Sequence, residues 1–509
     1  MNFKKITSLV IATAITAALI SGCRGTTTSN IETPEELTIH MHFFDYCVYD
    51  EDWPIFQKAA EITGIKLRGT VSETISNSGQ AYSTMLVENT LPDIIHYTTP
   101  SLTTLAKDGG LIPLDDLIDK YAPNIKKFFE ECAVARLAAT APDGHIYFIP
   151  GSLSGVDENA IPAMGWFIRQ DWLDKLGLKR PTTVQELHDV LLAFKQRDPN
   201  GNGEADEIPL FKRAGGISDI LQLFDADNGW RLNKDGKLVF GQTEEAYKNA
   251  MRELAKWYKE GIIDPEIFSR GSQARDQLLS TDKGGCTHDW FSSTASYNDK
   301  YAETVPGLNF IPITPPADIN GVIKETTVRG LTHGLAWGIS KDNKYPEATI
   351  KYFDFWLSEE GRTLNGYGVE GLHYNVVDGE KVFTNTVLSA KEGIPTYMRN
   401  QGQVEIGTVG SLATELAGMN EIALKGFNEY RNNKYGVPPV PPFNLNEEEN
   451  EIKNQYYTNL TTFMNEQQQK WLMGVETVDA TWDKYIETIT NMNYYEIEKI
   501  YNDAYNRIK

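Results

Sequence analysis

The pattern of apolar residues between positions 37 and 97 constrains the fold most. Residues 37–44 alternate between apolar and polar side chains, which predicts a half-buried β-strand. Residues 65–71 and 91–97 predict two further strands, and a helical pattern separates each strand from the next. Strand–helix–strand units of this length form parallel strands with right-handed crossovers, so the chain is expected to have an α/β fold.

Polar side chains follow the first and third of these predicted strands. Asp45 and Tyr46 come directly after the first strand, and Tyr97 and Thr98 lie at the end of the third. Ligands on parallel sheets bind beyond the carboxyl ends of the strands. These four residues are therefore candidates for a ligand-binding edge.

The length and charge of the chain limit what it can be. A chain of 509 residues is too long for one ordinary hydrophobic core, so two or more lobes are expected. The formal net charge of −22 argues against a nucleic-acid partner. Beyond the N-terminal segment, Cys47, Cys132 and Cys286 form no disulfide framework, and their spacing is compatible with one pair or with three thiols.

The N-terminal residues have the features of a secretion signal. Two lysines precede an apolar segment, residues 6–20, that is too short to span a bilayer. The Leu-Ile-Ser-Gly-Cys sequence that ends at Cys23 resembles a bacterial lipobox. We therefore predict a signal peptide over residues 1–22 and a tether over residues 23–35, with acyl chains such as palmitate on Cys23 holding the body on a membrane. An ordinary signal with a chance cysteine and an uncleaved anchor are the alternatives.

The loop over residues 198–207 has the oxygen spacing of an EF-hand calcium loop. The oxygen side chains at positions 1, 3, 5 and 9 belong to Asp198, Asn200, Asn202 and Asp206. Gly203 stands at position 6, and Glu204 at position 7 would supply its backbone carbonyl. Pro209 replaces the bidentate glutamate at position 12, so Glu207 is expected to close the shell. A structural Ca²⁺ site is predicted, with a metal-free Asx-turn loop as the alternative.

Together these features resemble one family, the extracellular solute-binding lipoproteins of ABC importers, of the carbohydrate (family 1) type and its large alginate- and oligosaccharide-binding members. The matching stretches are residues 91–95 (LPDII), 166–178 (WFIRQDWLDKLGL), 198–209 and 284–290 (GGCTHDW). The resemblance covers nearly the whole chain after Cys23. It implies two α/β lobes joined by hinge strands, with a helical C-terminal region.

The resemblance also implies a function and a division of the chain. An oligosaccharide would be captured between the lobes and delivered to ABC permease subunits, without catalysis, by a monomer on the extracytoplasmic face. The chain is expected to divide into a first lobe, residues 36–155 and 305–346, and a second lobe, residues 156–304 and 347–509. The acidic charge weakly favours a neutral oligosaccharide over a uronate.

Sugar capture needs flat aromatic faces and planar polar groups, which selects several candidates. The resemblance gives Trp290 as a sugar-stacking residue, with a core position as the alternative. Trp166 and Trp230 fit a cleft and a core equally well. Arg329 and Tyr367 are weaker candidates, and a plain surface loop is the alternative for Tyr367.

Arg169 is a further candidate with two interpretations. Its guanidinium can bind two sugar hydroxyls or a uronic carboxylate, or it can pair with Asp171 or Glu186 instead.

Two other functions stay open at this stage. A secreted glycoside hydrolase is one, although the sequence has neither a Gly-x-Ser-x-Gly elbow nor a His-Glu-x-x-His helix. The abundant carboxylates leave room for a glycosidase pair. The other alternative keeps the fold but binds a peptide or senses a ligand.

Overall fold

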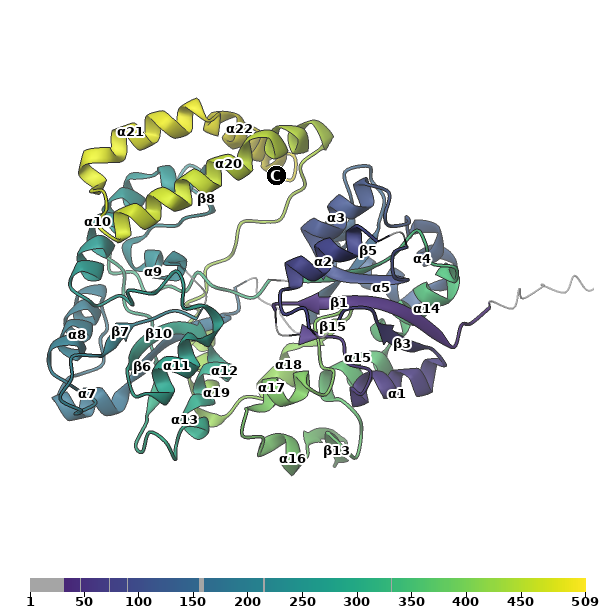
Figure 1. The fold of residues 1–509 in the computed structure, drawn as a ribbon, viewed down its shortest axis with the longest axis horizontal. Helices are drawn as coiled ribbons and strands as arrows, with labels where there is room; N and C mark the ends of the chain where they lie inside the picture. The colour runs from purple at the N-terminus through teal and green to yellow at the C-terminus, as the bar shows by residue number, and fades with distance from the viewer. Residues whose placement is uncertain are drawn as a thin grey trace, which may run out of the picture. The chain divides into compact units, whose positions relative to one another are not determined.

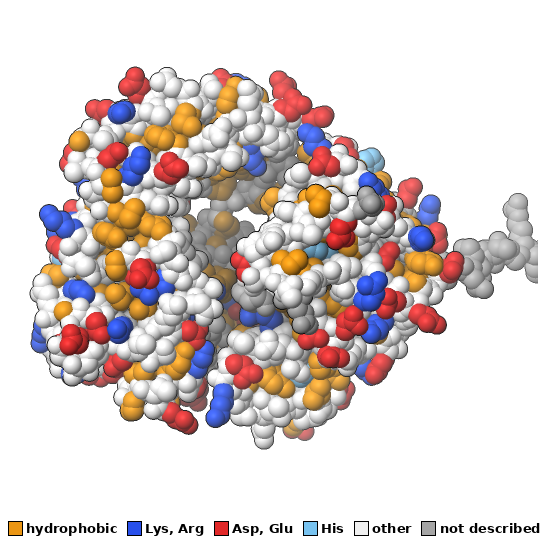
Figure 2. All heavy atoms as spheres, viewed as in Figure 1, with side chains coloured by type: hydrophobic (Ala, Val, Ile, Leu, Met, Phe, Trp, Pro, Cys, Tyr) orange, Lys and Arg blue, Asp and Glu red, His pale blue; other side chains and the backbone are white. Residues whose placement is uncertain are grey.

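Two larger sheets organise the chain in the computed structural model, which describes residues 32–45, 47–72, 74–88, 90–154, 160–213, 216–330 and 332–509 (Figure 1). Of the predicted site residues, Cys23 and Tyr46 lie outside the described residues. No helix in the described ranges is long and apolar enough to cross a membrane. On the face drawn in Figure 2, Lys and Arg side chains are interspersed with Asp and Glu.

The first sheet has the order β15-β5-β12-β4-β1-β2, and β3 also pairs with β1. Its strands are β1 (Glu36–Phe43), β2 (Cys47–Val48), β3 (Lys66–Gly69), β4 (Ile94–Thr98), β5 (Phe148–Ser154), β12 (Thr332–Ile339) and β15 (Val409–Ser411). Strand β1 runs parallel to both β3 and β4. This confirms the parallel arrangement predicted from the strand–helix–strand pattern.

Helices connect the strands of the first sheet. Before β5 these are α1 (Pro54–Thr63), α2 (Ser78–Leu86), α3 (Thr99–Lys107), α4 (Asp115–Tyr121), α5 (Pro123–Glu131) and α6 (Ala133–Ala139). Between β12 and β15 lie α14 (Pro346–Leu357), α15 (Glu359–Tyr367), the hairpin β13 (Tyr374–Val377) and β14 (Glu380–Phe383), α16 (Asn385–Leu388) and α17 (Ile394–Arg399). Gly64 ends α1 at a φ of 76°, the left-handed conformation that glycine adopts readily.

The second sheet has the order β11-β6-β10-β7. Its strands are β6 (Met164–Arg169), β7 (Ile208–Leu210), β10 (Gly284–Trp290) and β11 (Phe310–Ile313). The elements around it are α7 (Gln170–Leu176), α8 (Val184–Gln196), α9 (Ser218–Leu221), β8 (Trp230–Leu232), β9 (Leu238–Phe240), α10 (Glu245–Lys259), α11 (Ala274–Ser280), α12 (Phe291–Ala295), α13 (Tyr297–Lys300) and α19 (Glu421–Asn432). The short helix α18 (Leu412–Ala417) follows β15 and contacts β15 and α15. The 3₁₀ turns are Gln222–Phe224, Gly241–Thr243 and Gly271–Gln273. β10 is parallel to β7 and antiparallel to β6.

A helical tail completes the second sheet's half of the chain. It consists of α20 (Glu447–Leu472), α21 (Val478–Asn491) and α22 (Tyr494–Asn506). Helices α20 and α21 contact α10, and α22 contacts α20 (Figure 1). Trp471 and Trp482 of the tail share one buried cluster with Trp172. α20 begins with a capping box between Asn446 and Glu449. Tail and second sheet therefore form a single core.

Strand pairing divides the chain differently from the expected lobe boundaries. β11 pairs with β6, so residues 310–313 belong to the second sheet, and the return to the first sheet is β12 rather than residue 305. α14 contacts β12, and β15 pairs with β5, so the first sheet's part extends to residue 411 instead of ending at 346. Apolar periodicity in the sequence predicts a strand but not the strand with which it pairs. The expected lobe boundaries therefore differ from those that the strand pairing gives.

The chain passes between the two sheets at their carboxyl edges. β5 ends at this edge of the first sheet and leads to β6, whose amino end lies beside the carboxyl end of β10 because Met164 is opposite Trp290. β11 runs parallel to β10 and leads back to β12, whose amino end lies at the same edge as the carboxyl end of β4. Every crossing thus adjoins the edge where ligands bind on such sheets.

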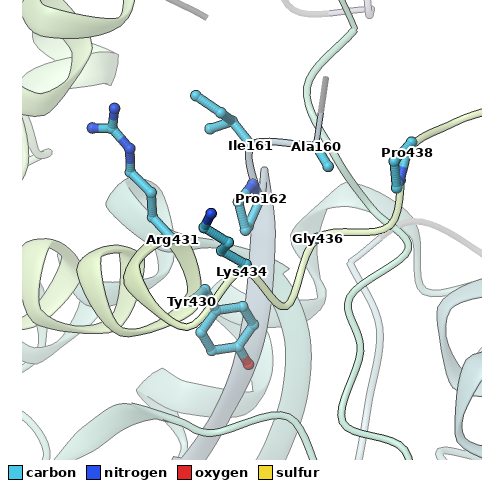
Figure 3. Close-up of a pocket in the computed structure, with 8 residues that line it drawn as sticks. All are labelled: Ala160, Ile161, Pro162, Tyr430, Arg431, Lys434, Gly436 and Pro438. Atoms are coloured by element: carbon cyan, nitrogen blue, oxygen red, sulfur yellow. The ribbon is translucent and has the colours of Figure 1, made fainter. Parts of the chain in front are cut away.

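Backbone hydrogen bonds join three segments near these crossings into a small ribbon, residues 161–163, 325–329 and 435–437. The Ala163 N–H donates to the Thr327 carbonyl over 2.9 Å, and the Val437 N–H donates to the Glu325 carbonyl over 2.8 Å. A cavity of about 310 Å³ adjoins the ribbon, with Gly436 and Pro438 on its wall (Figure 3). Gly436 passes so close to the Ala160 carbonyl oxygen that a Cβ would lie 1.8 Å from it.

We expect Gly436→Ala to destabilise this ribbon, because its Cβ would overlap a backbone atom that cannot turn away. The free energy of unfolding should fall by about 1–3 kcal/mol, measured as a lower midpoint of thermal unfolding. Gly334→Ala is the matched control, since no described atom lies within 4 Å of its added Cβ. Equal midpoints for the two variants would contradict the prediction.

Candidate functional site

The carboxyl ends of β7 and β10 meet at one edge of the second sheet and enclose a cavity of about 130 Å³. Asp289 and Trp290 end β10, and Lys212 and Arg213 follow β7. The cavity is lined by Met164, Lys212, Arg213, Gly216, Ser218, Asp219 and Asp289. Two cations and two carboxylates thus converge at the position where α/β sheets bind ligands, and Trp290 follows one of these carboxylates in the chain.

The charges around this cavity are arranged as ion pairs. The Arg213 Nε lies 3.2 Å from both carboxylate oxygens of Asp289, and Lys212 pairs with Asp219. Arg275 lies behind Asp289, with 3.5 Å between its Nε and Oδ2. Burial opposes the charge of Asp289, but Arg275 and Arg213 outweigh burial and hold its pKa below the usual value. The cavity wall therefore offers guanidinium donors beside ionised carboxylate acceptors.

Trp290 is half-buried at the end of β10, where it precedes α12. Its backbone N–H donates to the Asp289 carboxylate over 2.8 Å. The guanidinium of Arg329 lies 5.4 Å from the centre of the Trp290 ring, and Arg329 also pairs with Glu415. The indole is thus held at the site edge with partial exposure and does not sit deep among aliphatic side chains.

His288 connects the site to the ribbon between the sheets. Its Nδ1 lies 3.0 Å from the Asp219 carboxylate and its Nε2 lies 2.8 Å from the carboxylate of Glu325, a ribbon residue. Burial by itself would lower the pKa of His288, but Glu325 and Asp219 raise it to about 9. Both ring nitrogens therefore donate, and the protonated imidazole bridges two carboxylates.

The edge of the first sheet carries the other predicted residues. Asp45 adopts a φ of 60°, and its carboxylate accepts hydrogen bonds from the Ser78 N–H (2.7 Å) and hydroxyl (2.8 Å) at the start of α2. The Tyr97 ring stacks on Tyr82 with a centroid separation of 4.3 Å. Thr98 precedes α3, and its hydroxyl contacts a serine of that helix. These residues lie at the carboxyl ends of β1 and β4, as their sequence positions predict.

Two predicted ligand contacts are buried and cannot reach a ligand in this structure. Trp166 is fully buried in the core, with its ring 5.3 Å from that of His288. Arg169 is 1% exposed and pairs with Asp171 and Asp282. The core position for Trp166 and the pairing with Asp171 for Arg169, both considered as alternatives, are what the structure shows.

Three further candidates are partly covered by neighbouring side chains. Trp230 stacks on Tyr501 of the tail at 4.3 Å. Tyr367 packs against Phe383 of the β13–β14 hairpin at 5.5 Å. Arg329 has a side chain that is only 10% exposed and already paired, so direct ligand contact through its guanidinium does not match the structure.

Sequence reasoning missed the polar groups around the 130 Å³ cavity. The sequence pattern did not single out Arg213, Asp219 or Asp289, although Lys212 and Arg213 lie shortly after β7. The tendency of ligands to bind beyond the carboxyl ends of strands would have pointed to these residues only if β7 had been predicted as a strand that pairs with β10.

The loop between α8 and β7 contains the predicted calcium ligands. The Asp198 carboxylate accepts hydrogen bonds from the N–H groups of Gly201 (2.8 Å) and Gly203 (3.0 Å), which wrap the backbone around it. Glu207 is fully buried, and neither of its carboxylate oxygens has a hydrogen-bond partner among the described residues. Burial first, and then the nearby Asp198 and Asp206, raise the pKa of Glu207.

This arrangement suits a loop that binds a cation better than a metal-free loop held only by its own hydrogen bonds. A buried carboxylate without a donor is costly, and a Ca²⁺ ion would satisfy it with several other loop oxygens. No cluster of three or more His, Cys, Asp or Glu with metal-binding geometry occurs in the described part of the chain. An EF-hand-like site also uses the side-chain oxygens of asparagine and backbone carbonyl oxygens as ligands. A cluster of His, Cys, Asp and Glu side chains does not include these ligands.

All three described cysteines are free thiols. Cys47 and Cys286 are buried, whereas Cys132 is partly exposed. Of the two arrangements that their spacing allowed, the structure shows three thiols.

The fold and this site define a two-lobe α/β binding protein with a helical C-terminal region. Residues 48–363 match the family described as bacterial extracellular solute-binding protein, and the chain belongs to this family. The chain is 27% identical over 485 residues to the fructooligosaccharide ABC transporter substrate-binding protein FusA of Streptococcus pneumoniae serotype 4, covering 89% of this chain and 87% of FusA.

Solved structures of sugar-binding proteins have the same fold as this chain. The alginate-binding protein AlgQ2, solved without calcium ion, is 35% identical with a TM-score of 0.85, covering 93% of this chain and 98% of AlgQ2. An EF-hand mutant of FusA in complex with fructo-nystose shares the fold at 23% identity and a TM-score of 0.75, covering 93% of this chain and 99% of that one.

The protein should lose stability as the pH rises, because His288 loses the proton with which it binds two carboxylates. Its pKa in the folded state, about 9, exceeds the ordinary histidine pKa of 6.5, so its contribution to stability is complete below pH 6.5 and is lost toward pH 9. We expect the midpoint of thermal unfolding to fall over this range in the wild type. His288→Gln should be less stable at pH 6 and should show a smaller fall, and parallel curves for the two proteins would contradict the assignment.

Proposed function

We propose that this protein is an oligosaccharide receptor of an ABC importer, which binds its ligand without cleaving it. The observation that carries the proposal is Trp290, which is half-buried at a carboxyl edge and directly follows Asp289, the partner of Arg213. An indole face suits the apolar face of a sugar ring, and donors next to acceptors suit its hydroxyls. The sugar-binding relatives FusA and AlgQ2 support carbohydrate as the ligand class.

Asp45, Tyr97 and Thr98 would complete the site from the first sheet. Trp230 and Tyr367 keep partial exposure and remain candidates at the margins of the site. The ABC permease subunits that receive the sugar are proposed from FusA, which is a substrate-binding protein of such a transporter.

We propose that the loop of residues 198–207 holds a structural Ca²⁺ ion. Its ligands would be the side chains of Asp198, Asn200, Asn202, Asp206 and Glu207 and the backbone carbonyl of Glu204. The buried, unpartnered carboxylate of Glu207 supports the proposal. AlgQ2 solved without calcium ion and an EF-hand mutant of FusA support calcium binding among relatives.

The N-terminal segment would place this receptor on the extracytoplasmic face of a cell membrane. We propose cleavage after residue 22 and lipidation of Cys23, because several acyl chains give a stable anchor at about 0.8 kcal/mol per buried CH₂. A lipoprotein relative, LipO of Bacillus subtilis, is 30% identical over 231 residues and supports this proposal.

The central test is calorimetry with a panel of sugars that contains kestose, neutral pentose and hexose oligomers, and an alginate trisaccharide. We expect binding of at least one sugar with no release of reducing ends, and Trp290→Ala should weaken that binding about tenfold or more. Tyr495→Ala is the control, since this aromatic is 57% exposed on α22. Release of reducing ends would contradict the receptor function and support a hydrolase.

Calcium should raise the midpoint of thermal unfolding. An ion that binds only the folded state at about 100 times its Kd stabilises it by about 2.7 kcal/mol. Glu207→Gln should lose most of this gain, whereas Glu204→Gln should keep it, because Glu204 would contribute only its backbone carbonyl. A wild-type midpoint that is the same in calcium and in excess chelator would contradict the proposal.

A further inference from the structure

One face of the Trp290 ring is covered by the buried guanidinium of Arg329. The Arg329 guanidinium lies over this ring at 5.4 Å from its centre and pairs with Glu415, and 10% of the Arg329 side chain is exposed. Burial lowers the pKa of Arg329 although Glu415 opposes this effect, so the guanidinium is strongly desolvated. Cation–π attraction is strongest under such desolvation.

The three residues come from separate parts of the chain. Trp290 ends β10, Glu415 lies in α18 directly after β15, and Arg329 belongs to the ribbon between β11 and β12. The Arg329 N–H donates to the Ile161 carbonyl over 2.8 Å, which fixes the Arg329 backbone within the ribbon. Two segments that pass between the sheets thus converge on one aromatic ring.

We propose that Arg329 is a positioning residue that orients the Trp290 ring for its ligand, with Glu415 holding Arg329 in place. This inference rests on the proposed function, in which Trp290 stacks on a sugar. The guanidinium covers one face of the ring, so the sugar stacks on the opposite face. Arg329 acts through the ring and makes no contact with the sugar.

The chemistry of the guanidinium explains why an arginine stands here. A planar guanidinium can lie flat on an indole and still direct N–H groups at a carboxylate. The compact ammonium of a lysine can satisfy only one of these two contacts well. Arg329→Lys therefore keeps the charge while it releases the ring, and Glu415→Gln removes the charge that anchors Arg329.

The first test measures affinity by calorimetry, with the sugar of the panel described above that the wild type binds most tightly. Arg329→Lys and Glu415→Gln should each bind it about three- to tenfold more weakly. Arg231→Lys is the matched control, because Arg231 also pairs with a half-buried glutamate, Glu244, elsewhere in the second half. This control should lower the midpoint of unfolding and leave affinity unchanged.

The second test observes the ring without any ligand. In protein labelled with 5-fluorotryptophan, the Trp290 fluorine resonance is identified by its loss in Trp290→Phe. Arg329→Lys should shift this resonance, and Arg231→Lys should not. An unshifted resonance, or an equal loss of affinity in the Arg231→Lys control, would overturn the inference. Failure of the wild type to bind any sugar would refute the carbohydrate function instead, while the resonance would still decide whether Arg329 orients the ring.

Discussion

The structure depends on the backbone hydrogen bonds that tie together the segments passing between the two sheets. Residues 161–163, 325–329 and 435–437 belong to distant parts of the sequence, yet each donates to or accepts from a neighbouring segment. Because these segments adjoin the carboxyl edges, the same ribbon carries Glu325, which binds His288, and Arg329, which covers Trp290. The ribbon therefore links the path of the chain to the side chains of the candidate site.

Local features of the sequence predicted the elements well, and distant pairings poorly. The strands and helices between residues 37 and 97 follow from apolar periodicity, and their parallel pairing follows from connection length. The partner of β11 could not be predicted, since a four-residue strand with Ile311 and Ile313 suits either sheet. The same reason explains β15, three residues long, whose pairing with β5 assigns the whole stretch before it to the first sheet.

Prediction of the candidate site was limited in the same way, because the sequence does not show which side chains of a strand are buried. Trp166 and Arg169 both lie on β6 in a stretch that resembles a binding family, but both side chains are buried. Whether a strand residue faces a core or a ligand depends on what packs over it, and Arg169 finds Asp282 from a turn more than a hundred residues away. Trp290 was selected through the family resemblance of residues 284–290, and in the structure it ends its strand with partial exposure.

The loop of residues 198–207 and the 130 Å³ cavity lie at opposite ends of the same two strands. The loop leads directly into β7, and Asn200 donates to the carbonyl of Asp282, just before β10 begins. Asp206 pairs with Lys283 at 3.0 Å, and the Ile208 N–H donates to the Lys283 carbonyl. An ordered loop therefore fixes the register of β7 against β10 at their amino ends. Since Arg213 follows one strand and Asp289 ends the other, the geometry of the cavity depends on this register, and a structural ion would act on binding from a distance through two short strands.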